Sequence, residues 1–234
     1  MPIRHSDPFH DPTNLPNMGV NPFVKALIDG AREGSLPVIF GDLLREHAGC
    51  WESRYGYSKT VLEVGCHKGD VLRDLAQDHA DTLFVGMDIT FKRVVETARK
   101  AVKHDLPNMK SVLANGQGVG QVFSDSELDG VVVFYPDPWT RKKRQLKNRL
   151  VNSEFLGSVA RILKPGGFFW FKTDHGGYFQ DVVKFAAEAG LEIKAPDDHS
   201  VTCRPYTSRF EHEFERRQVP KFEVFFGKQS VPKS

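Results

Sequence analysis

Asp137 is the residue whose neighbours best equip it for chemistry. It follows an apolar run, 131–134, that has the length and β-branched content of a buried strand. Pro136 and Pro138 flank it, and because proline fixes its own φ and restricts the residue before it, the loop is expected to be rigid. The sequence therefore predicts a strand that delivers one carboxylate, with Trp139 beside it, to a stiff loop where it could stabilise positive charge. Capping of a turn is the structural alternative for the same carboxylate.

A block of cations follows this loop without an intervening acid. Such a block beside a reactive loop would suit a phosphate-bearing ligand such as RNA. A solvated charged face is the alternative, because most charge runs are no more than that. The cations are Arg141, Lys142, Lys143, Arg144, Lys147 and Arg149.

Length and composition limit the class of protein. The chain has 234 residues, 40% hydrophobic and 26% charged, which is ordinary for one soluble α/β domain. Its net charge of +2 is small, so affinity for a nucleic acid must come from local clusters. Cys50, Cys66 and Cys203 are odd in number and lack metal-ligand spacing, which argues against a metal site or a disulfide framework and favours the cytoplasm. No apolar run is long enough to span a membrane.

The ends and the middle of the chain differ in character. Residues 1–22 hold five prolines and are expected to form an extended, loosely held arm, with 23–234 as a single domain. From there apolar runs alternate with amphipathic stretches, which is the βαβ pattern of a parallel sheet. The pattern predicts an α/β fold with a doubly wound, mostly parallel sheet of seven strands. Strands are expected at 60–65, 83–89, 109–114, 131–135, 168–172, 191–194 and 222–227. Helices are expected at 23–33, 70–78, 91–104, 152–163 and 178–189, with another around Leu43, Leu44 and His47.

The first three strands end in residues that could hold an adenosyl cofactor, since ligands bind at the carboxyl ends of such strands. Glu63 and Gly65 end the first, where glycine lets a ligand approach the backbone. Asp88 ends the second and could accept hydrogen bonds from both ribose hydroxyls, or it could cap the next helix. Asn115 follows the third, where its amide could read an adenine edge or form a plain turn. The G-x-G-x-x-G pattern of dinucleotide enzymes is absent, because only Gly69 follows Gly65.

These residues and several others resemble the tRNA (guanine-N7)-methyltransferases, which use S-adenosylmethionine to methylate guanine 46 in the variable loop of tRNA. The resemblance runs from about Phe40 to Gly227 and implies the Rossmann-like fold of class I methyltransferases. Its most specific part is the Asp-Pro-Trp loop with its cations, together with Phe-Lys-Thr-Asp at 171–174. The other shared motifs are Phe-Gly-Asp at 40–42, Glu-Val-Gly at 63–65 with Lys68 and Gly69, Phe-Val-Gly at 84–86 leading to Asp88, and Leu-Lys-Pro-Gly-Gly at 163–167.

The resemblance also implies roles for individual residues, with S-adenosylmethionine as cofactor and tRNA as partner. It places the cofactor against Glu63, Gly65, Asp88, Asn115 and Asp137, with Asp137 also acting in catalysis. It places the RNA against Arg141, Asp174, Ser208, Arg209, Phe210 and Glu211. The chain departs from the family at His67, where glycine is usual, at Asn115, where an acid is common, and at Ser208, where the family has threonine.

Methylation at guanine N7 uses a free lone pair and needs no general base, so positioning should supply most of the acceleration. His67, His175 and His199 are therefore interpreted as ordinary polar loop residues, while Trp139 and Phe210 could either shape a base site or pack. Two other functions stay open. One is a methyltransferase that acts on another RNA or on a small molecule, and the other is a non-catalytic RNA-binding protein that has kept the fold, which the histidine in the first loop makes plausible.

Overall fold

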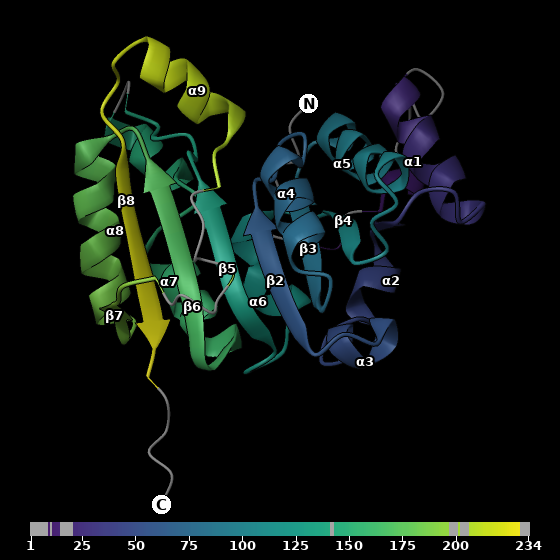
Figure 1. Ribbon diagram of the computed structural model, residues 1–234, viewed down its shortest axis with the longest axis horizontal. Coiled ribbons are helices and arrows are strands. Elements are labelled where there is room, and N and C mark those ends of the chain that lie inside the picture. Colours follow the sequence, from purple (N-terminus) through teal and green to yellow (C-terminus); the bar gives the residue numbers. More distant parts are fainter. Residues whose placement is uncertain are drawn as a thin grey trace, which may run out of the picture.

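One eight-stranded sheet organises the described residues in a computed structural model of the protein, with helices on both faces (Figure 1). The structure describes residues 9, 11–14, 21–140, 143–196, 201 and 206–229, and of Asn14, Lys143, Arg144 and Arg209 only the backbone. The strand order is β1-β4-β3-β2-β5-β6-β8-β7, and every strand points the same way except β8. The chain lays down β2, β3 and β4 in one direction and then β5 and β6 in the other. The order therefore switches between β2 and β5, where a ligand site is expected.

The elements have the following bounds. The strands are β1 (Val38–Ile39), β2 (Lys59–Val64), β3 (Thr82–Asp88), β4 (Met109–Leu113), β5 (Leu128–Phe134), β6 (Leu163–Thr173), β7 (Leu191–Ile193) and β8 (Phe222–Lys228). The α-helices are α1 (Pro22–Arg32), α2 (Asp42–Arg45), α3 (Trp51–Tyr55), α4 (Asp70–Asp78), α5 (Phe91–Lys103), α6 (Val119–Val122), α7 (Ser153–Ile162), α8 (Gly176–Glu188) and α9 (Arg209–Arg216). Short 3-10 turns lie at η1 (Pro12–Asn14), η2 (Gly116–Gly118) and η3 (Lys143–Asn148).

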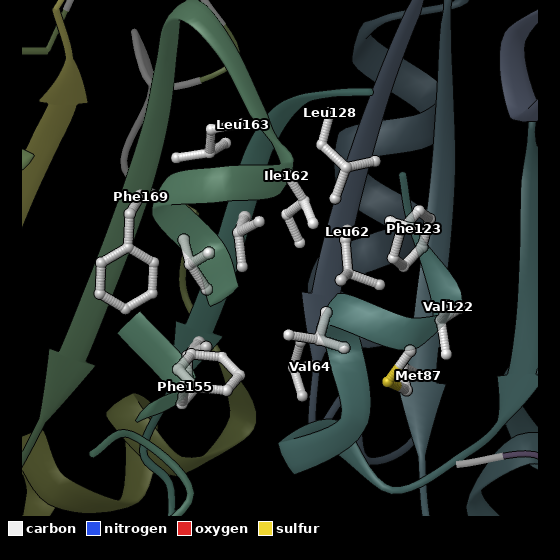
Figure 2. Packing of buried hydrophobic residues seen from close by; sticks show 14 of the residues in the cluster. Leu62, Val64, Met87, Val122, Phe123, Leu128, Phe155, Ile162, Leu163 and Phe169 are labelled. Atoms are coloured by element: carbon white, nitrogen blue, oxygen red, sulfur yellow. The ribbon is translucent and has the colours of Figure 1, made fainter. Parts of the chain in front are cut away.

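The two faces of the sheet bury different clusters, as alternation along β2 requires. Leu62 and Val64 join the larger cluster together with Met87 of β3 and Phe155 of α7 (Figure 2). Val61 points to the opposite face and packs with residues of α4. Since apolar side chains cover both faces, the central strands read as apolar runs and only their ends are free to carry polar groups.

The seven strands expected from the sequence are all present, and the expectation for α4 matches residue for residue. An eighth strand, β1, was not foreseen, because it has two residues and follows Pro37. Strand β6 starts five residues early, since Leu163 already pairs with Leu128 before a bulge. Val102 of α5 is apolar but 55% exposed.

The segment between Asp42 and Thr60, in which a helix is expected around Leu43, Leu44 and His47, lies near the amino ends of the central strands. It forms α2 and α3, and the Trp51 amide donates to Glu127, which immediately precedes β5, at 3.2 Å. The amino ends of parallel strands face away from a ligand edge, so this segment closes the core and covers no site. Of the arm, Phe9 is buried under the guanidinium of Arg45, which lies 3.7 Å from the ring centroid, so the chain is anchored at this residue. Residues 1–8, 10 and 15–20 lie outside the described residues, and the expectation of a loosely held arm stays a prediction.

Candidate active site at the carboxyl ends of the central strands

Glu63 is a buried carboxylate in the middle strand of the sheet. It lies on β2 between Gly86 of β3 and Val132 of β5, and only 5% of it is exposed. The Leu72 backbone N–H donates to it, but Oε2 has no hydrogen-bond partner among the described residues. Burial above all, with the charges of Asp70 and Asp88, raises the pKa of Glu63 to about 8. A buried oxygen of this kind is able to accept a hydrogen bond from a group that the described residues do not supply.

Asp88 ends β3, and its carboxylate accepts hydrogen bonds from neighbouring backbone N–H groups. Its Oδ1 accepts from the Thr90 N–H at 2.8 Å, and the His67 N–H from the loop after β2 also donates to the carboxylate. Burial raises its pKa despite these bonds. The helix-capping alternative does not hold, because the N-cap of α5 is Thr90.

Gly65, which follows β2, leaves the backbone open. It is exposed, has φ +79°, and a side chain placed there would meet nothing within 4 Å. Asn115 follows β4, and its Oδ1 accepts from the Gln117 N–H at 3.1 Å, which caps η2. Asn115 therefore forms the turn that was the structural alternative, while its contact with an adenine stays a prediction.

The loop after β5 is strained as well as proline-flanked. Tyr135 and Trp139 have φ +52° and +46°, in the left-handed region that residues other than glycine seldom adopt. Asp137 and Trp139 are both exposed, Trp139 at 39%. Strain of this kind persists only where surrounding contacts enforce it, and it is common at functional sites.

Arg149 enforces this conformation, which corrects its assignment to the phosphate-binding block. It is 8% exposed, its Nε donates to Pro138 O at 2.9 Å, and its guanidinium pairs with Asp181 at 2.6 Å. The guanidinium also lies 4.4 Å from the ring centroid of Tyr178. A cation used in this way holds the loop and is not available to RNA. Of the remaining block, Lys147 is exposed; Arg141 and Lys142, and the side chains of Lys143 and Arg144, lie outside the described residues.

Helix α9 lies across the edge of the sheet at which β5 and β6 end (Figure 1). Ser208 and Glu211 form its capping box, with Ser208 N donating to Glu211 Oε2 at 2.6 Å. Glu211 Oε1 also pairs with Lys172 Nζ at 3.1 Å, and both side chains are buried. The two predicted RNA ligands thus have internal partners, and RNA contact by them stays a prediction. Phe210 is 39% exposed, and the side chain of Arg209 lies outside the described residues.

The arrangement brings most of the predicted site residues to one edge. The ends of β2, β3 and β5 carry Glu63, Asp88 and Asp137, and Asp174 follows β6, half-buried. An edge that carries a buried acid, a half-buried acid, an open glycine and an exposed acid can hold a cationic ligand beside a flat aromatic one.

Comparison with known proteins agrees with this geometry. A family model described as "Putative methyltransferase" matches residues 57–224. A tRNA (guanine-N(7)-)-methyltransferase of Lactococcus lactis subsp. cremoris (strain SK11) is 32% identical over 166 residues, covering 66% of this chain and 76% of that one. The chain belongs to the tRNA (guanine-N7)-methyltransferase family. A member from Clostridium botulinum (strain Loch Maree / Type A3) is 29% identical over 192 residues, covering 79% of this chain and 86% of that one.

Solved structures outside the tRNA (guanine-N7)-methyltransferase family share the fold. The 16S rRNA methyltransferase KamB superposes with a TM-score of 0.55 at 17% identity, covering 80% of this chain and 92% of that one. The cyclase SpnF reaches 0.54 at 14% identity, covering 81% and 80%. At such identities the likeness concerns the fold alone, and a cyclase on the same fold shows why function must be argued from the site.

The sequence did not single out two residues that lie beside the candidate site of this tRNA (guanine-N7)-methyltransferase family member. Lys172 ends the apolar run 168–171 and lies buried between Glu211 and Glu223, 3.6 Å from the latter. Tyr135 packs on Phe214, and burial together with a hydrogen bond to Glu211 raises its pKa. A lysine at the end of an otherwise apolar strand was the available signal for the first, because a buried cation requires a partner. No local signal marks the second.

Proposed function

We propose that this protein transfers the methyl group of S-adenosylmethionine to N7 of guanine in tRNA, at position 46 of the variable loop. The observation that carries the proposal is that buried Glu63, whose Oε2 has no partner among the described residues, lies with Asp88 and the exposed Asp137 at the ends of adjacent strands, where the strand order switches. Family membership supplies the substrate class. The reaction is placed in the cytoplasm, in keeping with the free thiols of Cys50 and Cys66. No helix in the described part of the chain has the length and apolar character to cross a bilayer.

The residues present fit the cofactor. S-adenosylmethionine, when bound, supplies a methyl group on a positively charged sulfur. Glu63 has an unpartnered buried oxygen that would accept from a cationic group, and Asp88 has a carboxylate that would accept from ribose hydroxyls. Gly65 leaves room for a ligand against the backbone. Asn115 would present its amide to the purine.

Catalysis by this chain's own residues is mainly a matter of position. Guanine N7 carries its lone pair in the plane of the ring, so no proton has to be removed before attack. Asp137, fixed by the strained loop and by Arg149 on Pro138, would stabilise the positive charge that grows on the purine. Trp139 and Phe210 are exposed rings near this edge and would shape the base site. Lys172 and Glu211 would hold α9 in place above it.

A substituted RNA tests the proposal directly. Purified protein is incubated with radiolabelled S-adenosylmethionine and a tRNA transcript that carries guanine at position 46, or with the same transcript carrying 7-deazaguanine there. Label is expected in the first and not in the second, because the second has no N7. Equal labelling of both would overturn N7 as the acceptor. Labelling of ribosomal RNA in preference to tRNA would overturn the substrate, and absence of heat on titration with S-adenosylhomocysteine would overturn the enzyme assignment.

A further inference from the structure

Helix α9 is joined to three different strand-end segments. Phe214 packs on Tyr135 of the β5 loop with ring centroids 5.1 Å apart, and Glu211 pairs with Lys172 at the end of β6. The third contact reaches the cofactor loop after β2, where the rings of Phe210 and His67 meet edge to face, 5.2 Å apart at 61°. The helix that carries residues predicted to face RNA therefore touches the loop predicted to face the cofactor through one ring pair.

The backbone of His67 is held by hydrogen bonds to residues of β3 and α5. Its φ is +50°, its N–H donates to the Asp88 carboxylate, and its carbonyl accepts from Thr97 Oγ1 at 3.3 Å. Glycine would take this conformation with less strain, so the conformation alone does not explain a histidine. A ligand that engages Asp88 acts on the acceptor of the His67 amide, and the His67 ring is what touches Phe210.

Two simpler roles for the imidazole do not account for its placement. Guanine N7 needs no general base, and burial together with Arg93 and Lys68 lowers the pKa of His67, so the ring is neutral at pH 7.5. A residue that merely filled the core would be buried, whereas His67 is half-exposed at the edge of the site. The ring is thus placed to connect two surfaces that bind different ligands.

We propose that His67 is a positioning residue that couples cofactor binding to tRNA binding through its contact with Phe210. The inference rests on the proposed function, because it needs both ligands at this edge. Coupling between two binding sites is reciprocal, so each ligand is expected to strengthen the other by the same factor. An aromatic edge contact of this kind corresponds to a factor of about two to ten.

Isothermal titration measures this factor. The dissociation constant of S-adenosylhomocysteine is determined at pH 7.5 with and without saturating tRNA transcript, and the ratio of the two is the coupling factor. Wild type is expected to give a ratio of about two to ten. His67→Gly and Phe210→Leu are each expected to bring the ratio close to one, and the double variant to add nothing further.

Two additional variants separate the loss of the His67 ring from loosening of the loop and from loss of an unrelated imidazole. His67→Asn keeps a residue that tolerates positive φ but lacks the ring, so it is expected to behave like His67→Gly even if glycine loosens the loop. His212→Ala removes an exposed imidazole of α9 and is the matched control, expected to keep the wild-type ratio.

The failures of the two proposals are distinguishable. If tRNA is bound and methylated at N7 but the wild-type ratio is one, the coupling is wrong and the proposed function stands. A ratio that persists in both His67 variants likewise overturns the role of His67. If no tRNA is bound or methylated, the proposed function fails, and the coupling fails with it.

Discussion

The two halves of the candidate site are built in opposite ways. Beside β2 and β3, Glu63 is buried and Asp88 half-buried, and both carboxylates accept hydrogen bonds from nearby backbone N–H groups. Beyond β5, Asp137 and Trp139 are exposed on a strained loop, and the side chain that holds this loop, Arg149, is buried behind it. This difference indicates that the first half suits a small ligand that becomes buried when it binds. The second half suits a large ligand that covers the exposed side chains when it binds.

The largest effect is expected at the exposed acid. Asp137→Asn keeps the shape of the side chain and removes its charge, so single-turnover methylation at saturating S-adenosylmethionine is expected to slow by about 10²-fold or more. Binding of tRNA should change far less, because the charge acts mainly on the transition state. Asp105→Asn, at the opposite end of the sheet, is the matched control. A near wild-type rate would make Asp137 a structural turn residue and remove the functional contrast between the halves.

Asp88 tests the buried half. Asp88→Ala is expected to weaken S-adenosylhomocysteine binding by about 1–3 kcal/mol, the range for a lost hydrogen bond to a charged group. Titration calorimetry measures this, with circular dichroism to confirm the fold. Asp81→Ala, next to the other end of the same strand, should leave the affinity unchanged. Unaltered affinity in folded Asp88→Ala would exclude this acid from the cofactor site.

Arg149 and Lys147 separate support of the loop from contact with RNA. Arg149→Met removes the bond to Pro138 O and is expected to slow methylation about tenfold, because Asp137 is then no longer held in place, with little change in cofactor affinity.

Lys147→Met is expected to leave the methylation rate at saturating tRNA intact and to reduce the salt slope of tRNA binding by about 0.7–0.9 if Lys147 contacts a phosphate. Equal salt slopes for Lys147→Met and wild type would class that lysine as solvated.

The smallest effect concerns protons at Glu63. With a pKa of about 8, this carboxyl is protonated in about nine of ten free molecules at pH 7. A cationic ligand group favours its ionised form, so binding of S-adenosylhomocysteine is expected to release close to one proton at pH 7 and to tighten about fivefold between pH 7 and pH 8. Calorimetry in two buffers of different ionisation enthalpy counts the protons. Glu63→Gln should release correspondingly fewer, and an unchanged count would place the ligand cation elsewhere.

Much of the fold was readable from the sequence, because its signals are local. The apolar runs of β2 to β6 and the amphipathic spacing of α5 and α7 need no knowledge of distant partners. Helix α9 was not predicted, since only Phe210 and Phe214 are apolar in it. A signal was nonetheless present, because serine followed three residues later by glutamate is the pattern of a capping box, here Ser208 and Glu211.

The sequence predicted which residues lie at the same edge of the sheet better than it predicted the contacts that each one makes. Strand ends brought Glu63, Asp88 and Asp137 to one edge as expected, because topology fixes the edge. The burial of Arg149 was not predictable, since its partner Asp181 lies 32 residues away and a charge run reads as exposed. The tie between Lys172 and Glu211 spans 39 residues, so it too emerges only from the packed structure.

The buried pair of Lys172 and Glu211 has a consequence for motion. Helix α9 has eight residues, too few to be stable alone, and its capping box shares Glu211 with the ion pair. When α9 detaches from the sheet, it loses its N-terminal cap and the ion pair together, and the Lys172 charge is left without Glu211. Partly detached states therefore bear the same cost in free energy as full detachment. The amides of this helix are expected to exchange with deuterium together, as one cooperative unit, instead of fraying progressively from an end.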